Sequence, residues 1–229
     1  YKEAHEDYSL ILAGPWNDFS ENSARRAAAI ATDQKDYATA YGHYQKLRAN
    51  AANSQSAEAA YRGLVKCGFN SGKYAEAISY ADSLLAMQGI SAETNNEALF
   101  YKARSLQQTD KNEEASALYR QLSADKNTET AAESRYHIAE ILLQQNKLKE
   151  AEDAANEGIK LSGGNDYWVV RSYLLLADIL VKEKDYFNAK ALLQSIVKRT
   201  KIAELKAEAT KKLDEVKKSE KRHSKLSGE

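Results

Sequence analysis

The chain has 229 residues, of which 43% are hydrophobic, and its 33 basic and 33 acidic residues leave no net charge. This balance argues against partners held by bulk charge, such as nucleic acid or an anionic membrane surface. The apolar runs are far shorter than the roughly 20 residues that cross a bilayer, and the single cysteine excludes an internal disulfide. With one proline and no stretch of alternating β-branched residues, the sequence predicts helices joined by short turns and essentially no sheet.

The first predicted element is a helix over residues 1–13, whose sequence begins YKEAHEDYSLIL. Ala4, Tyr8 and Ile11 recur at spacings of four and three residues. These spacings place the three side chains on one face of a helix, so the chain is helical from its first residues.

Five later segments share one pattern of small and apolar residues. When they are aligned on a common alanine, the separations are 37, 38, 36 and 38 residues, and the positions four and seven residues later are mostly apolar. That spacing marks the buried face of a helix. The aligned residues, called here the anchor alanines, are Ala40, Ala77, Ala115, Ala151 and Ala189.

A second helix precedes each anchor alanine. Twelve residues before the anchor stands a small residue that lets two helices approach closely, and short polar turns such as TDQKD and NSGK separate the helices. This small column reads Ala28, Val65, Ala103, Ala139 and Ala177. The sequence therefore predicts five helix pairs, over residues 20–53, 54–90, 91–127, 128–164 and 165–200.

Capping boxes are predicted at the start of two first helices. Thr94 with Glu97, and Thr130 with Glu133, have the three-residue spacing at which each side chain satisfies a backbone N–H of the other residue.

The helix over residues 1–13 fits the same frame, because Ala4 lies 36 residues before Ala40. It corresponds to the second helix of a pair. We therefore expect a half-repeat whose partner helix belongs to a longer parent protein, with this chain as its C-terminal part. A natural N-terminal capping helix is the alternative interpretation.

These recurring residues resemble the tetratricopeptide repeat, a helix–turn–helix unit of about 34 residues. The resemblance covers residues 1 to about 200 and implies an all-α, right-handed superhelix whose first helices line a concave groove. The longer period of 36 to 38 residues and the absence of the proline that usually ends the second helix depart from the family. More loosely, the chain is similar to long cell-envelope repeat proteins of Gram-negative bacteria, which implies a periplasmic or envelope location.

After residue 200 the pattern changes to one apolar stripe on an otherwise charged helix. We expect residues 201–222 to cap the last helix pair, so that residues 1–223 form a single solenoid, and residues 223–229 to form a flexible tail. A partner-binding or coiled-coil helix is the alternative. The stripe consists of Ile202, Leu205, Ala209, Leu213 and Val216.

No catalytic or metal-binding motif is recognisable in the sequence. The four histidines are scattered, one cysteine cannot build a cysteine-rich zinc site, and no phosphate-binding glycine motif occurs. Cys67 is expected to be a packed thiol rather than a nucleophile. The segment LSGGND at 161–166 is expected to hold a glycine with positive φ at a helix end, not a phosphate loop. We therefore expect no enzyme activity, no cofactor and no metal.

The small column also predicts which side chains face the groove, namely those three residues before it, one after it and four after it. The predicted groove is basic at first, then aromatic, then acidic. Basic and aromatic groups together suit an extended peptide, because arginine can bind a carboxylate while rings bury side chains. The predicted groove residues are Arg25, Arg62, Lys66, Phe69, Phe100, Arg104, Tyr136, Glu140 and Asp178.

Two features limit this interpretation. The chaperone-tail binders of the family use a Lys/Asn clamp for a C-terminal carboxylate, and the asparagine is missing from the matching column here. The opposite charges could also form ladders between adjacent first helices, without any role in binding.

The sequence thus predicts a noncatalytic scaffold that binds a partner peptide or protein domain in the groove, within a bacterial envelope or assembly complex. One alternative is self-assembly, as a homodimer through the exposed N-terminal half-repeat. Another is a docking arm for an enzyme whose catalytic part lies elsewhere in the parent protein. We expect no nucleic-acid partner and no direct membrane insertion.

Overall fold

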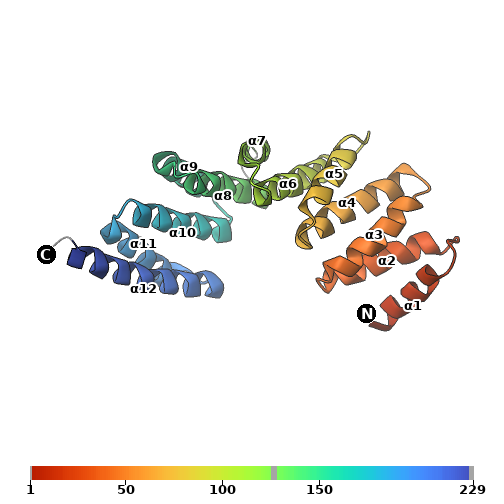
Figure 1. Ribbon diagram of the computed structural model, residues 1–229, viewed down its shortest axis with the longest axis horizontal. Coiled ribbons are helices and arrows are strands. Elements are labelled where there is room, and N and C mark those ends of the chain that lie inside the picture. The colour runs from red at the N-terminus through yellow and green to blue at the C-terminus, as the bar shows by residue number, and fades with distance from the viewer. Residues whose placement is uncertain (1, 125–127, 227–229) are drawn as a thin grey trace. The chain divides into compact units, whose positions relative to one another are not determined.

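The computed structural model describes the backbone of residues 2–124 and 128–226, and the side chains of residues 7–124 and 128–222. Within these residues it contains α-helices and no strand (Figure 1), so the predicted all-α fold is confirmed. The side chain of Ala4 and the last residues of the predicted tail, 227–229, lie outside this part of the chain.

The helices fall into two compact units, Tyr1–Leu118 and Tyr119–Glu229. The helices of unit 1 are α1 (Lys2–Ala13), α2 (Ser20–Asp33), α3 (Tyr37–Ala49), α4 (Ser54–Asn70), α5 (Tyr74–Leu85) and α6 (Ala92–Gln108). The boundary lies inside α7 (Asn112–Leu122). Unit 2 continues with α8 (Glu129–Gln144), α9 (Leu148–Leu161), α10 (Asp166–Lys182), α11 (Tyr186–Arg199) and α12 (Ala203–Leu226). Each predicted pair range holds two helices, and one continuous solenoid over 1–223 stays a prediction.

Within each unit, helices that are consecutive in the sequence pack against each other. In unit 1 each helix from α1 to α6 contacts the next, and α4 also contacts α2 and α6. In unit 2 the same holds from α8 to α12, and α10 also contacts α8 and α12. Within each unit the first helices of successive pairs therefore stack on one another, and in unit 2 α12 takes the place of a further first helix. All five anchor alanines are 0% exposed, which confirms them as the buried face.

One turn recurs between the two helices of every pair. The residue five positions before each anchor alanine has a positive φ, between 59° and 74°. Its N–H and the next N–H donate back into the preceding helix, as when Lys184 donates to the carbonyl of Val181 and Asp185 to that of Leu180. This is the Schellman ending of a helix. The positive-φ residues are Lys35, Gly72, Asp110, Asn146 and Lys184.

The two predicted capping boxes are wrong. The cap of α6 is Ser91, whose hydroxyl accepts from the N–H of Thr94 at 3.0 Å, and the cap of α8 is Thr128, which accepts from Ala131 at 3.2 Å. Thr94 and Thr130 therefore lie inside their helices. The prediction failed because each threonine is preceded, two or three residues earlier, by another hydroxyl residue, Ser91 or Thr128. That earlier hydroxyl accepts the hydrogen bond from a free N–H of the first helical turn, so the helix begins there.

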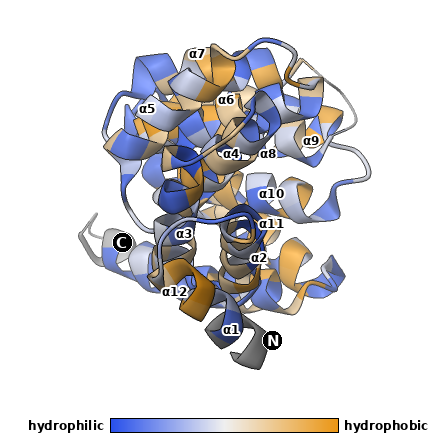
Figure 2. Ribbon diagram, turned by 90° about the vertical axis from the view of Figure 1, so that its right-hand side faces the viewer, coloured by the Kyte–Doolittle hydropathy of each residue, from blue (hydrophilic) through white to orange (hydrophobic). Residues whose placement is uncertain are grey.

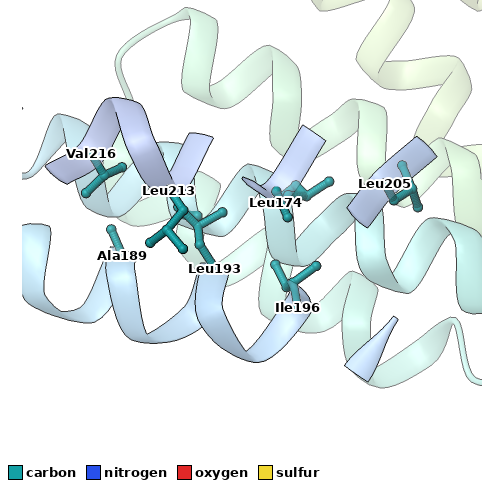
Figure 3. Packing of buried hydrophobic residues seen from close by; sticks show 9 residues of the cluster. Leu174, Ala189, Leu193, Ile196, Leu205, Leu213 and Val216 are labelled. Atoms are coloured by element: carbon teal, nitrogen blue, oxygen red, sulfur yellow. The ribbon is translucent and has the colours of Figure 1, made fainter. Parts of the chain in front are cut away.

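The last helix, α12, packs its apolar stripe on α10 and α11. Figure 3 shows Leu213 beside Leu193 and Val216 near Ala189 of α11, and Leu205 belongs to the same buried cluster. The hydropathy view in Figure 2 shows hydrophobic and hydrophilic segments alternating along the helices, as expected when each helix buries one face. The helix runs to Leu226, so it continues into the segment predicted as a flexible tail.

Candidate binding site on the stacked helices

Charged side chains link neighbouring first helices in unit 1. The Arg62 guanidinium of α4 donates through Nε and Nη2 to Glu97 Oε2 of α6, at 3.0 and 2.7 Å. Burial works against the charge of Arg62, but the hydrogen bond and charge of Glu97 outweigh it and raise the pKa of Arg62. Arg25 of α2 contacts Glu21 at 3.3 Å and Ser56 of α4 at 3.4 Å. The ladder of opposite charges that the sequence offered as an alternative therefore exists for Arg62, whereas the carboxylate partner of Arg25 lies on its own helix.

A cavity of about 270 Å³ opens beside the Arg62–Glu97 pair. Its wall combines two cationic groups with one carboxylate, two hydroxyl groups and a thiol. The lining residues are Thr32, Tyr44, Ala59, Arg62, Gly63, Lys66, Cys67 and Glu97. Two predicted groove residues, Arg62 and Lys66, thus meet in one cavity. With both cations and Glu97 charged, the wall carries one net positive charge and suits an anionic side chain.

Gly63 shapes this cavity by letting the Tyr44 ring lie against the backbone of α4. A Cβ at position 63 would come within 2.4 Å of three ring atoms of Tyr44. Burial raises the pKa of the Tyr44 hydroxyl, and the nearby Cys67 adds to this. The position therefore needs glycine for a close approach rather than for an unusual backbone angle.

The helices α4 and α6 also hold an arginine stacked on a phenylalanine ring. The Arg104 guanidinium of α6 lies 4.3 Å from the ring centre of Phe69 and 5.6 Å from that of Phe100. Tyr74 and Tyr101 complete the cluster, each with its ring 5.7 Å from that of Phe69. Phe100 is only 9% exposed, so its ring belongs largely to the core, whereas Phe69 and Arg104 are half-buried. The stack holds the guanidinium in one orientation.

The three predicted groove residues of unit 2 lie in a polar network. The Tyr136 hydroxyl donates to Glu140 Oε1 at 3.0 Å, and Lys212 of α12 donates to both oxygens of Asp178 at 2.7 Å. Tyr136 is 6% exposed, and burial followed by the charge of Glu140 raises its pKa. Burial also raises the pKa of Asp178, although Lys212 opposes this. These carboxylates are engaged within unit 2.

Sequence reasoning missed the partners of these residues, although a signal was present. The missed side chains include Glu97 and Arg171, which both stand six residues before the small column. Each contacts a residue of the preceding helix pair that lies three positions before the small column of that pair. Glu97 contacts Arg62, and Arg171 contacts Tyr136. Once the stacking of α4 on α6 and of α8 on α10 is known, the two columns account for both contacts.

Cys67 is packed as predicted. It is 0% exposed, and its sulfur lies 3.7 Å from the Thr32 hydroxyl. Burial raises the pKa of the thiol, which keeps it protonated at neutral pH. Among the described residues, no three His, Cys, Asp or Glu side chains gather closely enough to hold a metal ion. Nor does any described helix combine the length and apolar character needed to cross a membrane.

Comparisons with known families agree with this geometry. A family model described as anaphase-promoting complex, cyclosome, subunit 3 matches residues 70–158, and a tetratricopeptide repeat model matches residues 171–199. Residues 171–199 thus match a tetratricopeptide repeat, and the chain has a tetratricopeptide-like fold of paired helices. A comparison with curated proteins found no match.

Solved structures share the repeat architecture. The apo form of RapI superposes with a TM-score of 0.71 at 13% identity, covering 91% of this chain and 62% of RapI. The TPR-like repeats of a Podospora anserina kinesin light chain give 0.64 at 14% identity, covering 86% of this chain and 100% of theirs. Yeast Tom70 gives 0.59 at 14% identity, covering 96% of this chain and 44% of Tom70. The repeats here thus span less than two thirds of RapI and of Tom70, and the likeness concerns the fold.

Proposed function

We propose that the chain is a noncatalytic protein-interaction scaffold, and that it binds a partner peptide or domain on the stacked faces of α4 and α6. One observation carries this proposal: the cavity lined by Arg62, Lys66 and Glu97 lies on the same two helices as the Phe69–Arg104 stack. A bacterial envelope complex as the setting rests on sequence resemblance alone.

The chemistry of this surface favours a partner that carries a carboxylate. The cavity wall has one net positive charge, and its Lys66 ammonium can donate to an anionic group. The Arg104 guanidinium is held on the Phe69 ring, so that a planar cation lies beside an aromatic surface. A partner side chain that ends in a carboxylate fits the cavity, and an adjacent apolar side chain of the partner fits the Phe69–Arg104 stack.

The fold supports the class of function. Stacked helix pairs form extended surfaces in which successive repeats present side chains in rows, and such surfaces bind proteins and peptides. In unit 1 those rows are the first-helix columns of α2, α4 and α6, which hold Arg25, Arg62 and Arg104.

Binding to labelled peptides tests the proposal. The probes are two libraries of fluorescent peptides with one aromatic residue each, the first carrying Asp or Glu and the second Asn or Gln at the same positions. We expect members of the acidic library to bind at least tenfold more tightly, since hydrogen bonds between charged groups contribute about 1.5–3 kcal/mol. The triple variant Arg62→Glu, Lys66→Glu, Arg104→Glu should lose this binding.

A matched control separates site from total charge. The variant Arg26→Glu, Lys149→Glu, Lys206→Glu changes the net charge equally at three exposed positions. It should bind like the parent chain. Equal binding by the site variant and the parent would show that the binding site is not on α4 and α6. Equal binding of both libraries would show that the partner needs no carboxylate.

Self-assembly is a second candidate because three large apolar side chains between residues 10 and 19 are exposed. Leu10 is 74% exposed and Phe19 73% exposed, with Trp16 at 36% between them in sequence. Sedimentation of the parent chain and of a Leu10→Glu, Phe19→Glu variant tests this. A dimer that the variant abolishes would support self-assembly, and a parent chain that stays monomeric would rule it out.

A further inference from the structure

A second cavity lies in unit 2, between the first half of α10 and the second half of α11. Its volume is about 210 Å³, and its floor is apolar and aromatic: Val170, Tyr173, Leu192 and Ile196. Ile196 is buried in the hydrophobic cluster of unit 2 that Figure 3 shows, and the other three pack against that cluster. The cavity is therefore a hollow in the side of the core on which α12 rests.

The same hollow occurs one helix pair earlier with a different lining. The residues that α9 and α11 contribute to their cavities stand at the same four positions, 3, 6, 7 and 10 residues after the anchor alanine of each pair. The earlier cavity, of about 290 Å³, has three charged lining residues, Arg120, Arg135 and Glu157. In the later cavity Ser195 replaces Glu157, and an isoleucine replaces the next glycine. The paired helices thus leave a hollow at this register, and the side chains decide its chemistry.

One cation stands at the apolar cavity. Among the described residues that line it, Arg199 alone is charged, and its side chain is exposed. Within the described part of the chain Arg199 takes part in no ion pair. Two hydroxyl residues, Ser195 and Thr200, complete the lining. The Thr200 hydroxyl accepts from the N–H of Ile202 at 3.2 Å and keeps its own proton to donate.

We propose that this cavity binds a small amphipathic carboxylate. The apolar chain of the ligand lies on Val170, Leu192 and Ile196, and its carboxylate lies at Arg199. One guanidinium balances one negative charge, and its planar N–H groups match the two oxygens of a carboxylate. An apolar floor with a few polar groups at one side is the usual composition of a small-molecule site.

The volume of the cavity limits the size of the ligand. At the packing density of a protein interior, about 0.74, the cavity holds a van der Waals volume of roughly 155 Å³, about that of a carboxylate with six to eight carbons. Drug-sized molecules occupy larger pockets, of about 300–1,000 Å³. A short-chain fatty acid therefore fits the cavity better than a larger ligand does.

A chemical-shift titration of the full chain, labelled with ¹⁵N, tests the site with sodium octanoate as the probe. We expect amide resonances of residues 168–175 and 192–202 to shift with one saturable dissociation constant of about 1 mM or below, since octanoate has ten non-hydrogen atoms. Octylammonium has the same chain and the opposite charge, and it should bind at least tenfold more weakly. Sodium chloride at the same concentrations should leave these resonances in place.

Two variants with matched controls assign the site to its residues. Arg199→Gln should weaken octanoate binding at least tenfold, because a hydrogen bond between charged groups contributes that much. Ser195→Leu fills the cavity and should abolish binding. The controls Lys198→Gln and Gln194→Leu make the same kinds of change at exposed positions of α11 outside the lining. They should bind octanoate like the parent chain, and circular dichroism checks that all four variants keep their helices.

Three outcomes would overturn the proposal. Equal binding of octanoate and octylammonium, or equal binding by Arg199→Gln and Lys198→Gln, would show that no carboxylate is recognised. Unchanged binding by Ser195→Leu would place the ligand outside the cavity. No saturable shift at ten times the expected dissociation constant would show that the hollow takes no free carboxylate. These results are independent of acidic-peptide binding on α4 and α6, because the two sites share no residue.

Discussion

At the scale of single residues, backbone angles decide how one helix pair is joined to the next. The connection between α9 and α10 contains two adjacent glycines, and only Gly164 has a positive φ, of 90°. A Cβ at either position would meet no atom within 4 Å. The two positions therefore differ in backbone conformation, while both have room for a side chain.

Replacing Gly164 by alanine should lower the free energy of unfolding by about 1 kcal/mol, because residues with a Cβ rarely adopt this conformation. Urea denaturation followed by circular dichroism measures the change. Gly163→Ala is the control and should have little effect. A loss at Gly163 as large as that at Gly164 would mean that the turn is sensitive to volume rather than to φ.

At the scale of elements, close approach of two helices depends on which positions lack a side chain. Gly63 of α4 and Gly42 of α3 both lie inside helices of unit 1. Only Gly63 faces a neighbouring ring, that of Tyr44, whereas a Cβ at Gly42 would meet nothing within 4 Å. The same substitution should therefore have opposite effects at the two positions.

Gly63→Ala should destabilise the chain by about 1–3 kcal/mol through overpacking, and Gly42→Ala should stabilise it by about 0.5–1 kcal/mol through helix propensity. Urea denaturation compares the two. Adding Tyr44→Leu to Gly63→Ala should recover part of the loss. If the double variant recovers nothing, the ring contact is not the cause.

Helix starts provide a second test at this scale. Thr128→Ala removes the cap of α8 and should cost about 1 kcal/mol, whereas Thr130→Ala, at the position that the sequence predicted as a cap, should cost less than half as much. Amide exchange in the first turn of α8 gives a local measure of the same effect. Equal costs at the two threonines would restore the predicted capping box.

At the scale of the whole molecule, repeat contacts are local. Among the described helices, α12 packs on α10 and α11, while Cys67 lies in the core of unit 1 with Leu64 and Tyr41. Because the helix pairs within each unit contact their neighbours in the chain, a defect at one end should stay near that end.

The buried Cys67 thiol reports on this locality. Leu84→Ala in α5 and Leu205→Ala in α12 each empty a site that is at most 2% exposed and should each cost about 2–5 kcal/mol. Under native conditions Leu84→Ala should speed thiol labelling at least tenfold, and Leu205→Ala should leave it unchanged. Equal acceleration by both variants would show that the chain unfolds as one cooperative block.

Several features of the fold could be predicted from the sequence alone. The anchor alanines, the small column and the apolar stripe of the last helix follow from periodicity, because burial demands a residue of the right size at a fixed place on each helix face. The recurrence of that pattern five times predicted the helix pairs. Chain order then supplied the contacts, since short turns force consecutive helices together.

Tertiary structure alone decided what the charged side chains do. Arg62 and Asp178 are both predicted from the sequence as charged groove residues. Stacking of the helices places Glu97 against Arg62 and Lys212 against Asp178. The caps at Ser91 and Thr128 likewise depend on where the helices begin. The physical reason is that helix periodicity fixes the direction of a side chain, whereas its partner depends on the distance to the next helix.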